Sequence, residues 1–399
     1  MATNASPHRH ILVFPYPAQG HMLPLLDLTH QLVLRGLTIT ILVTPKNLPF
    51  LSTLLSSHPS SITPLVFPFP SHPLIPTGVE HVKDLGNTGN LPMMAALAKL
   101  HDPLLDWFNS HPNPPVAILS DFFLGWTQRL ATSLQIPRIT FFSSGAFVAS
   151  VMDYIWNNVE KLKSLSEIEF RHLPGSPIIK QEHLPPGWGC VLNTFDALEA
   201  EYVQCLKAHV GHDRVFDVGP LSLTGPDVLD RGNSSSGSDL NDQVLTWLDQ
   251  CPDGSVVYVS FGSQKLLRKE QMEALANGLE KSGTRFIWVV KSGTIQQQDE
   301  GYGVVPDGFE QRIARQGLYV NARLLVDDVG VGVRVCEGRD SVPDSDEVGR
   351  AIAEVITKGE GMKGKAKDLK GEALAAMSQG GSSMKNLDRF VEEVCQLGA

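Results

Sequence analysis

The sequence predicts an α/β protein of two domains, the first of them built on a parallel, doubly wound sheet. The chain has 399 residues, which is too many for one ordinary hydrophobic core. Short apolar runs alternate with stretches of helical spacing, as expected for successive βα units. A segment rich in Gly, Ser and Asp, residues 221–242, lies between two such patterns and predicts a linker.

The first pattern predicts four strands with helices between them. The strand-like runs are short and rich in Val, Ile and Phe, and they cover residues 11–14, 37–43, 116–120 and 138–142. Helical spacing is found at 22–35 and 125–134. This alternation favours a parallel sheet, which binds ligands beyond the carboxyl ends of its strands.

The second pattern begins as a βαβ unit and then weakens. Strands are predicted at 256–261 and 285–290, with a helix at 268–281 between them. After residue 291 only one clear strand follows, at 331–335, among helical stretches at 321–329, 346–357 and 384–396. A nucleotide-binding half of a doubly wound fold needs several adjacent parallel strands, so this second sheet is predicted to be thin.

Composition and charge argue against several classes of protein. Hydrophobic residues make up 42% of the chain and charged residues 19%, as in a globular protein that folds in water. The net charge of -10, without a basic cluster, argues against a nucleic-acid partner. Five dispersed Cys indicate reduced thiols, and no apolar run approaches the length of a membrane span. Because the N-terminus also lacks a signal peptide, we expect a cytoplasmic protein.

His21 is the first candidate for chemistry. It follows the first predicted strand in a turn rich in Pro and Gly and precedes the first helix. It therefore lies at the edge where open α/β sheets bind ligands, and imidazole is the usual general base near neutral pH. A single His at such a turn is more often a surface or capping residue, so position alone leaves both interpretations open.

Asp121 is the second candidate, because it ends a predicted strand at the same edge. A carboxylate there can hold an imidazole in one tautomer and balance its charge, as in catalytic triads. Asp also favours the N-cap of a helix. The pattern alone favours the cap and allows both roles.

Polar residues follow two further predicted strands. Ser143 and Ser144 come after the strand at 138–142, and Gly262 and Ser263 come after the strand at 256–261. Either pair can contact a polar ligand, and the N-terminus of a following helix favours phosphate. A helix cap or an ordinary strand-to-helix turn explains them as well.

Two motif matches carry little weight. Residues 359–365 have the spacing of a P-loop, but Ala366 replaces the required Ser or Thr, and a helical stretch precedes them. Asp344 and Asp346 resemble an acidic metal-binding pair, but they precede a helix and are interpreted as caps. The chain has no G-x-S-x-G motif and no zinc-type Cys/His spacing, which disfavours a serine hydrolase or a metalloenzyme.

Several segments together resemble the plant family 1 UDP-glycosyltransferases of secondary metabolism. They are FPYPAQGH (14–21), LSDFFLGW (119–126), GCVLNTF (189–195), VGPL (218–221), WLD (247–249), VVYVSFGS (256–263), NARLL (321–325), GGSS (380–383) and NL (386–387). The segments follow the family's order from near the start of the chain to its end. The likeness is greatest to members that glycosylate flavonols and other phenols.

The resemblance implies an inverting transfer of a sugar, expected to be glucose, from UDP-glucose to a hydroxyl of a flavonoid or another small phenolic acceptor. His21 matches the family's general base, and Asp121 matches the carboxylate that holds it. The other matched positions contact the donor (Ser143, Gly262 and Ser263) or the acceptor (Gln19 and Phe122). The resemblance implies no metal or other cofactor, and we expect a monomer.

The family has two facing Rossmann-like domains of the GT-B type. The resemblance places the acceptor domain at 1–222, a linker at 223–242, the donor domain at 243–383 and a helix that returns to the first domain at 384–399. The donor domain is expected to be truncated by the loss of central strands.

The family's signature donor box is absent from this chain. The box opens with Trp-x-Pro-Gln, which occurs nowhere here, and no His follows His212 to match its diphosphate-binding His. Gly317-Leu318 joins directly to Tyr319, where family members carry the whole box. A second, smaller gap is expected between Pro185 and Gly187. Two clean gaps indicate missing exons or an imperfect gene model.

The loss of the box predicts weak binding of the donor. Hydrogen bonds to charged groups contribute roughly 1–3 kcal/mol each, so losing several lowers the affinity for a UDP-sugar by orders of magnitude. We therefore expect slow transfer. The alternative is a catalytically inactive chain that retains only an acceptor-binding cleft.

Overall fold

The computed structural model describes residues 9–85, 89–157, 188–224, 246–261, 265–290, 295–306, 309 and 341–397, together with two short strands, β6 (Ile168–Glu169) and β7 (Ile178–Ile179). The chain divides into two compact units. The first unit combines Met1–Gly232 with Gly371–Ala399, and the second is Asn233–Lys370.

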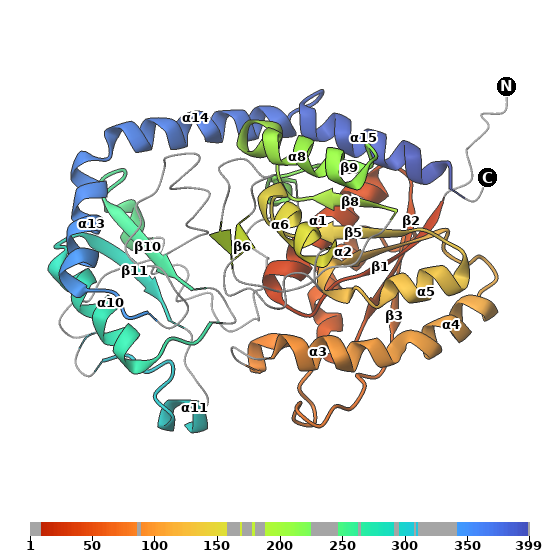
Figure 1. The fold of residues 1–399 in the computed structure, drawn as a ribbon, viewed down its shortest axis with the longest axis horizontal. Coiled ribbons are helices and arrows are strands. Elements are labelled where there is room, and N and C mark those ends of the chain that lie inside the picture. The colour runs from red at the N-terminus through yellow and green to blue at the C-terminus, as the bar shows by residue number, and fades with distance from the viewer. Residues whose placement is uncertain are drawn as a thin grey trace. The chain divides into compact units, whose positions relative to one another are not determined.

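A seven-stranded parallel sheet forms the centre of the first unit (Figure 1). Its strands are β1 (His10–Phe14), β2 (Thr38–Val43), β3 (Ile62–Val66), β4 (Ala117–Asp121), β5 (Arg138–Phe142), β8 (Gly189–Leu192) and β9 (Val215–Asp217). Their order in space is β3-β2-β1-β4-β5-β8-β9. The chain thus builds outward from β1 in one direction and then from β4 in the other, and ligands bind at such a reversal point.

Helices cover both faces of this sheet (Figure 1). They are α1 (Gln19–Leu34), α2 (Ser52–Ser57), α3 (Asn90–Leu97), α4 (His101–Ser110), α5 (Thr127–Leu134), α6 (Ala146–Asn157), α8 (Asp196–Val210) and α15 (Ser382–Cys395). Short 3-10 helices are η1 (Pro45–Leu51), η2 (Val82–Asp84), η4 (Ala98–Leu100), η5 (Phe122–Leu124) and η6 (Leu221–Leu223).

The alternation of side chains along β1 explains the two faces. Ile11 and Val13 point to one side, where they join a core with apolar residues of α1, α2 and α15. Leu12 and Phe14 point to the other side, where α3, α4 and α5 supply the core. Because both faces are covered, the strands are buried and almost entirely apolar, as in other parallel sheets.

The last helix, α15, packs on the edge strand β9 of the same sheet. Phe390 meets Phe216 edge-on at 5.1 Å between ring centroids. Ser383 Oγ donates a hydrogen bond of 2.7 Å to the carbonyl oxygen of Gly219. The C-terminal segment is therefore an integral part of the first unit.

The four predicted strands of the first unit are confirmed, and their ends agree within one residue. Three strands of the seven-stranded sheet, β3, β8 and β9, were not predicted, and neither were β6 and β7 of the small second sheet. Pro64 interrupts the apolar run of β3, while β8 and β9 have only four and three residues. Such short runs give too little periodicity to be recognised.

The described part of the second unit contains one βαβ arrangement. Strands β10 (Val256–Ser260) and β11 (Arg285–Val289) pair in parallel, and its helices are α10 (Lys269–Lys281), α11 (Ile295–Asp299) and α13 (Ser345–Lys358). Helix α14 (Glu360–Met377) begins in this unit and ends in the first, whose second segment starts at Gly371. Helices α10 and α13 approach closely at Gly278, where a Cβ would lie 2.5 Å from Cβ of Val348. The predicted helix at 321–329 and strand at 331–335 lie outside the described residues.

Both discounted motifs form ordinary helical structure. Gly361 and Gly364, which belong to the P-loop spacing, lie inside α14. Asp344 caps α13, because its Oδ1 accepts hydrogen bonds from the backbone N–H groups of Asp346 and Glu347 at 3.0 and 2.9 Å. Asp346 itself pairs with Lys281 at 2.6 Å.

Candidate active site

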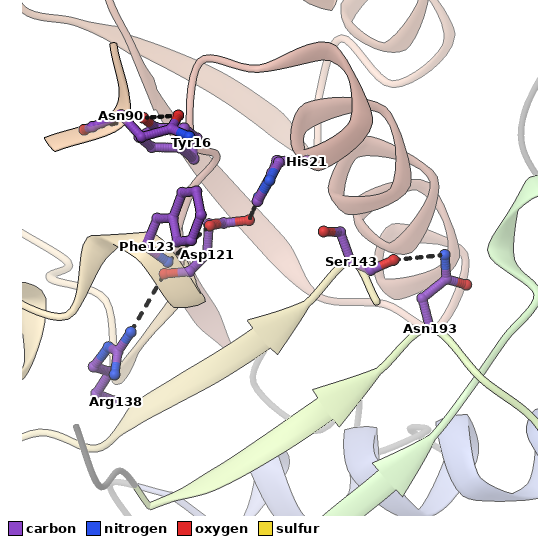
Figure 2. A network of polar contacts seen from close by, with 8 residues as sticks. All are labelled: Tyr16, His21, Asn90, Asp121, Phe123, Arg138, Ser143 and Asn193. Carbon is purple, nitrogen blue, oxygen red and sulfur yellow. Dashed lines mark hydrogen bonds and ion pairs between the residues drawn. The ribbon is translucent and has the colours of Figure 1, made fainter. Parts of the chain in front are cut away.

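His21 and Asp121 meet at the carboxyl edge of the first sheet, where the strand order reverses (Figure 2). Strands β1 and β4 run in parallel with Phe14 opposite Ser120, so the residues that follow both strands lie at one edge. Asp121 is the last residue of β4, and His21 lies in the first turn of α1. His21 Nδ1 is 2.9 Å from Asp121 Oδ2. The Asp121 side chain is 0% exposed and that of His21 is 15% exposed.

Asp121 fills both roles that the sequence allowed. Its Oδ1 accepts a hydrogen bond of 2.9 Å from the backbone N–H of Phe123, which caps η5. Its Oδ2 faces His21, and because an ionised carboxylate only accepts, Nδ1 of the imidazole must be the donor. The lone pair of His21 then lies on Nε2, which is the arrangement of a general base whose tautomer is fixed from behind.

Aromatic rings surround the imidazole of His21. Phe122 stacks on it at 5.2 Å between centroids, Phe123 lies at 4.8 Å, and Tyr16 meets it edge-on at 5.4 Å. The Tyr16 hydroxyl donates to Asn90 Oδ1 at 2.9 Å. Burial raises the pKa of Tyr16, and the carboxylate of Asp121 raises it further, so the phenol stays neutral.

The loop after β5 is held by a partly buried Asn193 and a buried Glu199. Asn193 Nδ2 donates to the carbonyl oxygen of Ser143 at 3.4 Å, and its Oδ1 accepts from the backbone N–H of Leu221 at 2.9 Å. The Glu199 carboxylate accepts from the backbone N–H groups of Ala146 and Phe147 at 2.7 and 3.0 Å. It therefore occupies the N-terminus of α6, which would otherwise attract an external anion.

The structure places three of the other predicted residues at the same edge as His21. Gln19 begins α1, Phe122 follows Asp121 directly, and Ser143 follows β5 (Figure 2 shows Ser143). Gly262 and Ser263 lie outside the described residues. The roles assigned to these five residues in binding donor or acceptor remain predictions.

Three residues of this site were not singled out from the sequence: Arg138, Asn193 and Glu199. In the sequence, Arg138 is only the first residue of a predicted strand. A charged residue at the start of a central strand does, however, indicate a buried polar contact. Asn193 and Glu199 flank the turn that links β8 to α8, and their partners are far away in the sequence. Only the folded chain brings them to the loop after β5.

The described residues offer neither a metal site nor a membrane span. No three His, Cys, Asp or Glu side chains of these residues gather into a group that could hold a metal ion. No helix formed by them is both long and apolar enough to cross a membrane.

No protein-family model matches the chain. Its sequence is 45% identical to UDP-glycosyltransferase 89A2 of Arabidopsis thaliana, in an alignment that covers 96% of this chain and 95% of that protein. It is 42% identical to the flavonol 3-O-glucosyltransferase UGT89B1 of the same plant, over 98% of this chain and 97% of that protein.

Solved structures give the same likeness. The crystal structure of Arabidopsis thaliana UGT89C1 complexed with UDP-L-rhamnose has a TM-score of 0.76 to this chain at 36% identity, with 97% of this chain and 99% of that chain covered. A crystal structure of the same protein complexed with quercetin has a TM-score of 0.73 at 34% identity, with 97% and 100% covered. These neighbours confirm the α/β fold with Rossmann-like domains.

Proposed function

Because the chain belongs to the plant family 1 UDP-glycosyltransferases, we propose that it transfers a sugar from a UDP-sugar to a hydroxyl of a flavonol or a related small phenol. The observation that carries this proposal is the His21–Asp121 pair at the reversal point of the first sheet. The pair leaves Nε2 of an orientated imidazole to accept a proton.

The proposed reaction is a single displacement with inversion at the anomeric carbon. The acceptor hydroxyl binds near Gln19 and Phe122 and gives its proton to Nε2 of His21 as its oxygen attacks. The bond from the anomeric carbon to the diphosphate oxygen breaks, and UDP leaves with the electron pair. Asp121 stabilises the imidazolium that forms, since its carboxylate lies 2.9 Å from Nδ1. Ser143, with Gly262 and Ser263, contacts the donor.

We propose glucose as the sugar. Support comes from UGT89B1, which is named a glucosyltransferase, whereas UGT89C1 was crystallised with UDP-L-rhamnose. Both sugars therefore belong in any assay. We further propose a cytoplasmic monomer that needs no metal or other cofactor, with the acceptor domain at 1–222, a linker at 223–242, the donor domain at 243–383 and the returning helix at 384–399.

We also propose that the donor side is impaired by an internal loss of sequence. The alignments to UDP-glycosyltransferase 89A2 and UGT89B1 extend over 460 and 468 positions, more than the 399 residues of this chain. Gaps in this chain account for the excess. The junction at 317–319, where we place the larger gap, lies outside the described residues. Weak donor binding is the expected consequence.

The test is a transfer assay with the purified chain. A flavonol is incubated with UDP-glucose or with UDP-L-rhamnose, and the glycoside is measured by mass spectrometry. We expect slow transfer from UDP-glucose, and His21→Ala lowers its rate about 10²- to 10⁴-fold because the general base is lost. If the chain binds the flavonol but forms no glycoside, the transferase proposal fails and the chain only binds acceptors.

A further inference from the structure

Arg138 lies on the side of Asp121 that is away from His21 (Figure 2). It begins β5, and its side chain is among the largest that are fully buried, with 1% of the residue exposed. Its Nε donates to Ser120 Oγ and Thr127 Oγ1 at 3.0 and 2.8 Å. Its Nη2 donates to the backbone carbonyl oxygen of Asp121 at 3.3 Å. One guanidinium thus contacts the end of β4 and the start of α5.

The charge of this guanidinium is poorly compensated. Burial lowers the pKa of Arg138 to about 10, and the carboxylate of Asp121 partly offsets that effect. The side chain is therefore still charged at neutral pH. Within the described residues Arg138 forms no direct ion pair, and its Nη1 has no hydrogen-bond partner. Such a buried cation is costly unless a nearby anion balances it, and Asp121 is the anion that acts on it.

The hydrogen bonds of Arg138 do not explain its presence. Ser120 Oγ and Thr127 Oγ1 already lie 2.8 Å apart in a hydrogen bond of their own. Thr127 also donates to the carbonyl oxygen of Leu124 at 2.7 Å. The turn between β4 and α5 therefore keeps its hydroxyl network without the guanidinium, and a neutral side chain of similar size would fill the same space.

We propose that Arg138 is a positioning residue for the His21–Asp121 pair, and that its buried positive charge opposes protonation of His21. A carboxylate beside an imidazole favours the imidazolium, yet a general base must be unprotonated to accept a proton. The buried guanidinium of Arg138 repels the positive charge of an imidazolium at His21, and so acts against the stabilisation that Asp121 gives to it. This inference rests on the proposed role of His21 as the base.

Among the described residues, the rings that contact the imidazole carry no charge, so they do not oppose an effect of Arg138 on the pair. From η5, Phe122 and Phe123 are uncharged, and from the segment after β1, Tyr16 is kept neutral by its raised pKa. The Asp121 carboxylate is the anion. Replacing Arg138 therefore changes the charge near His21 without touching the rings that contact it.

The experiment measures the protonation of His21 without any sugar donor. The full chain is treated with diethyl pyrocarbonate, which acylates unprotonated imidazole, and the extent of reaction at His21 is followed against pH by peptide mass spectrometry. Wild type is compared with Arg138→Met and Arg138→Gln, which remove the charge, and with Arg138→Lys, which keeps it. Thr127→Val is the structural control, because it removes an acceptor of Arg138 and leaves every charge in place.

The two neutral variants are expected to move the midpoint of the reaction upward by about one pH unit, the lower end of the effect of a nearby charge. Arg138→Lys and Thr127→Val are expected to stay close to wild type. The inference is overturned if a folded neutral variant, checked by circular dichroism, keeps the wild-type midpoint. It is also overturned if Thr127→Val shifts the midpoint as much as Arg138→Met does.

This outcome is independent of transfer. If the chain transfers sugar and the midpoint does not move, the role of Arg138 fails and the proposed function stands. If the midpoint moves and no transfer is measured, the role of Arg138 is confirmed and the proposed sugar transfer is not.

Discussion

The contact between His21 and Asp121 determines the tautomer of the imidazole. One imidazole nitrogen donates to a carboxylate that is 0% exposed, and that bond fixes which nitrogen can act as a base. The carboxylate is itself fixed by the backbone N–H of Phe123. Removing its charge, with no change of size, is therefore the most specific perturbation of the pair.

Asp121→Asn is expected to lower the rate of transfer at least about 100-fold, because the amide no longer stabilises the imidazolium. The measurement is the initial rate of glycoside formation at fixed concentrations of both substrates. Asp106→Asn, at an exposed position of α4, is the matched control and keeps the wild-type rate. A rate for Asp121→Asn equal to that control would exclude Asp121 from the chemistry.

The raised pKa of Asp217 makes the stability of the folded chain depend on pH. Burial, and then the neighbouring carboxyl of Asp196, raise the pKa of Asp217 to about 7 from 3.8. The folded chain therefore binds a proton between pH 4 and 7 that the unfolded chain does not, so stability falls as pH rises through that range. Asp217→Asn removes this cost and is expected to raise the free energy of unfolding by about 1–3 kcal/mol at pH 8.

The gain from Asp217→Asn should shrink toward zero below about pH 3, where the wild-type carboxyl is protonated in both the folded and the unfolded chain. Urea unfolding of both chains at several pH values measures it. A gain that is the same at every pH would show that the carboxyl does not titrate as described.

At the scale of elements, Glu199 joins two helices of the first unit. It belongs to the first turn of α8, and its carboxylate caps the N-terminus of α6 through two backbone N–H groups. Gly145 leaves room for it, because a Cβ there would overlap the carboxylate. The loop that carries Ser143 is thereby held in place before any ligand binds.

Glu199→Ala is expected to lower the free energy of unfolding by about 2–3 kcal/mol, since three buried donors lose their acceptor: the N–H groups of Ala146 and Phe147 and the hydroxyl of Thr194. Glu199→Gln keeps one acceptor oxygen and should lose less. Urea unfolding measures both, with Glu201→Ala at an exposed position of α8 as the control. Equal stability of Glu199→Ala and Glu201→Ala would contradict the capping role.

The elements also show what the sequence could predict. Strands β1, β2, β4 and β5 were predictable because each is a continuous apolar run, and together they place His21 and Asp121 at one edge. The contacts of Arg138, Asn193 and Glu199 were not predictable, because their partners are 5 to 53 residues away in the sequence. Such contacts depend on register and packing, which periodicity does not encode.

At the scale of the whole molecule, the number of described parallel strands differs between the two units. The first unit has seven parallel strands around the reversal point, and the described residues of the second have two. The sequence pattern predicts few strands in the second unit, and the internal loss of sequence that we propose would account for that pattern. The chain combines a complete acceptor-side pair with a donor side that we propose is impaired.

Calorimetric titration of UDP into the purified chain tests this combination most directly. The proposed loss of the donor box predicts heats too small to fit, or a dissociation constant in the millimolar range, about −4 kcal/mol of binding free energy. Titration of a flavonol into the same sample should still give a saturable signal. Micromolar or tighter binding of UDP would contradict the account, because it would show that the donor site is intact.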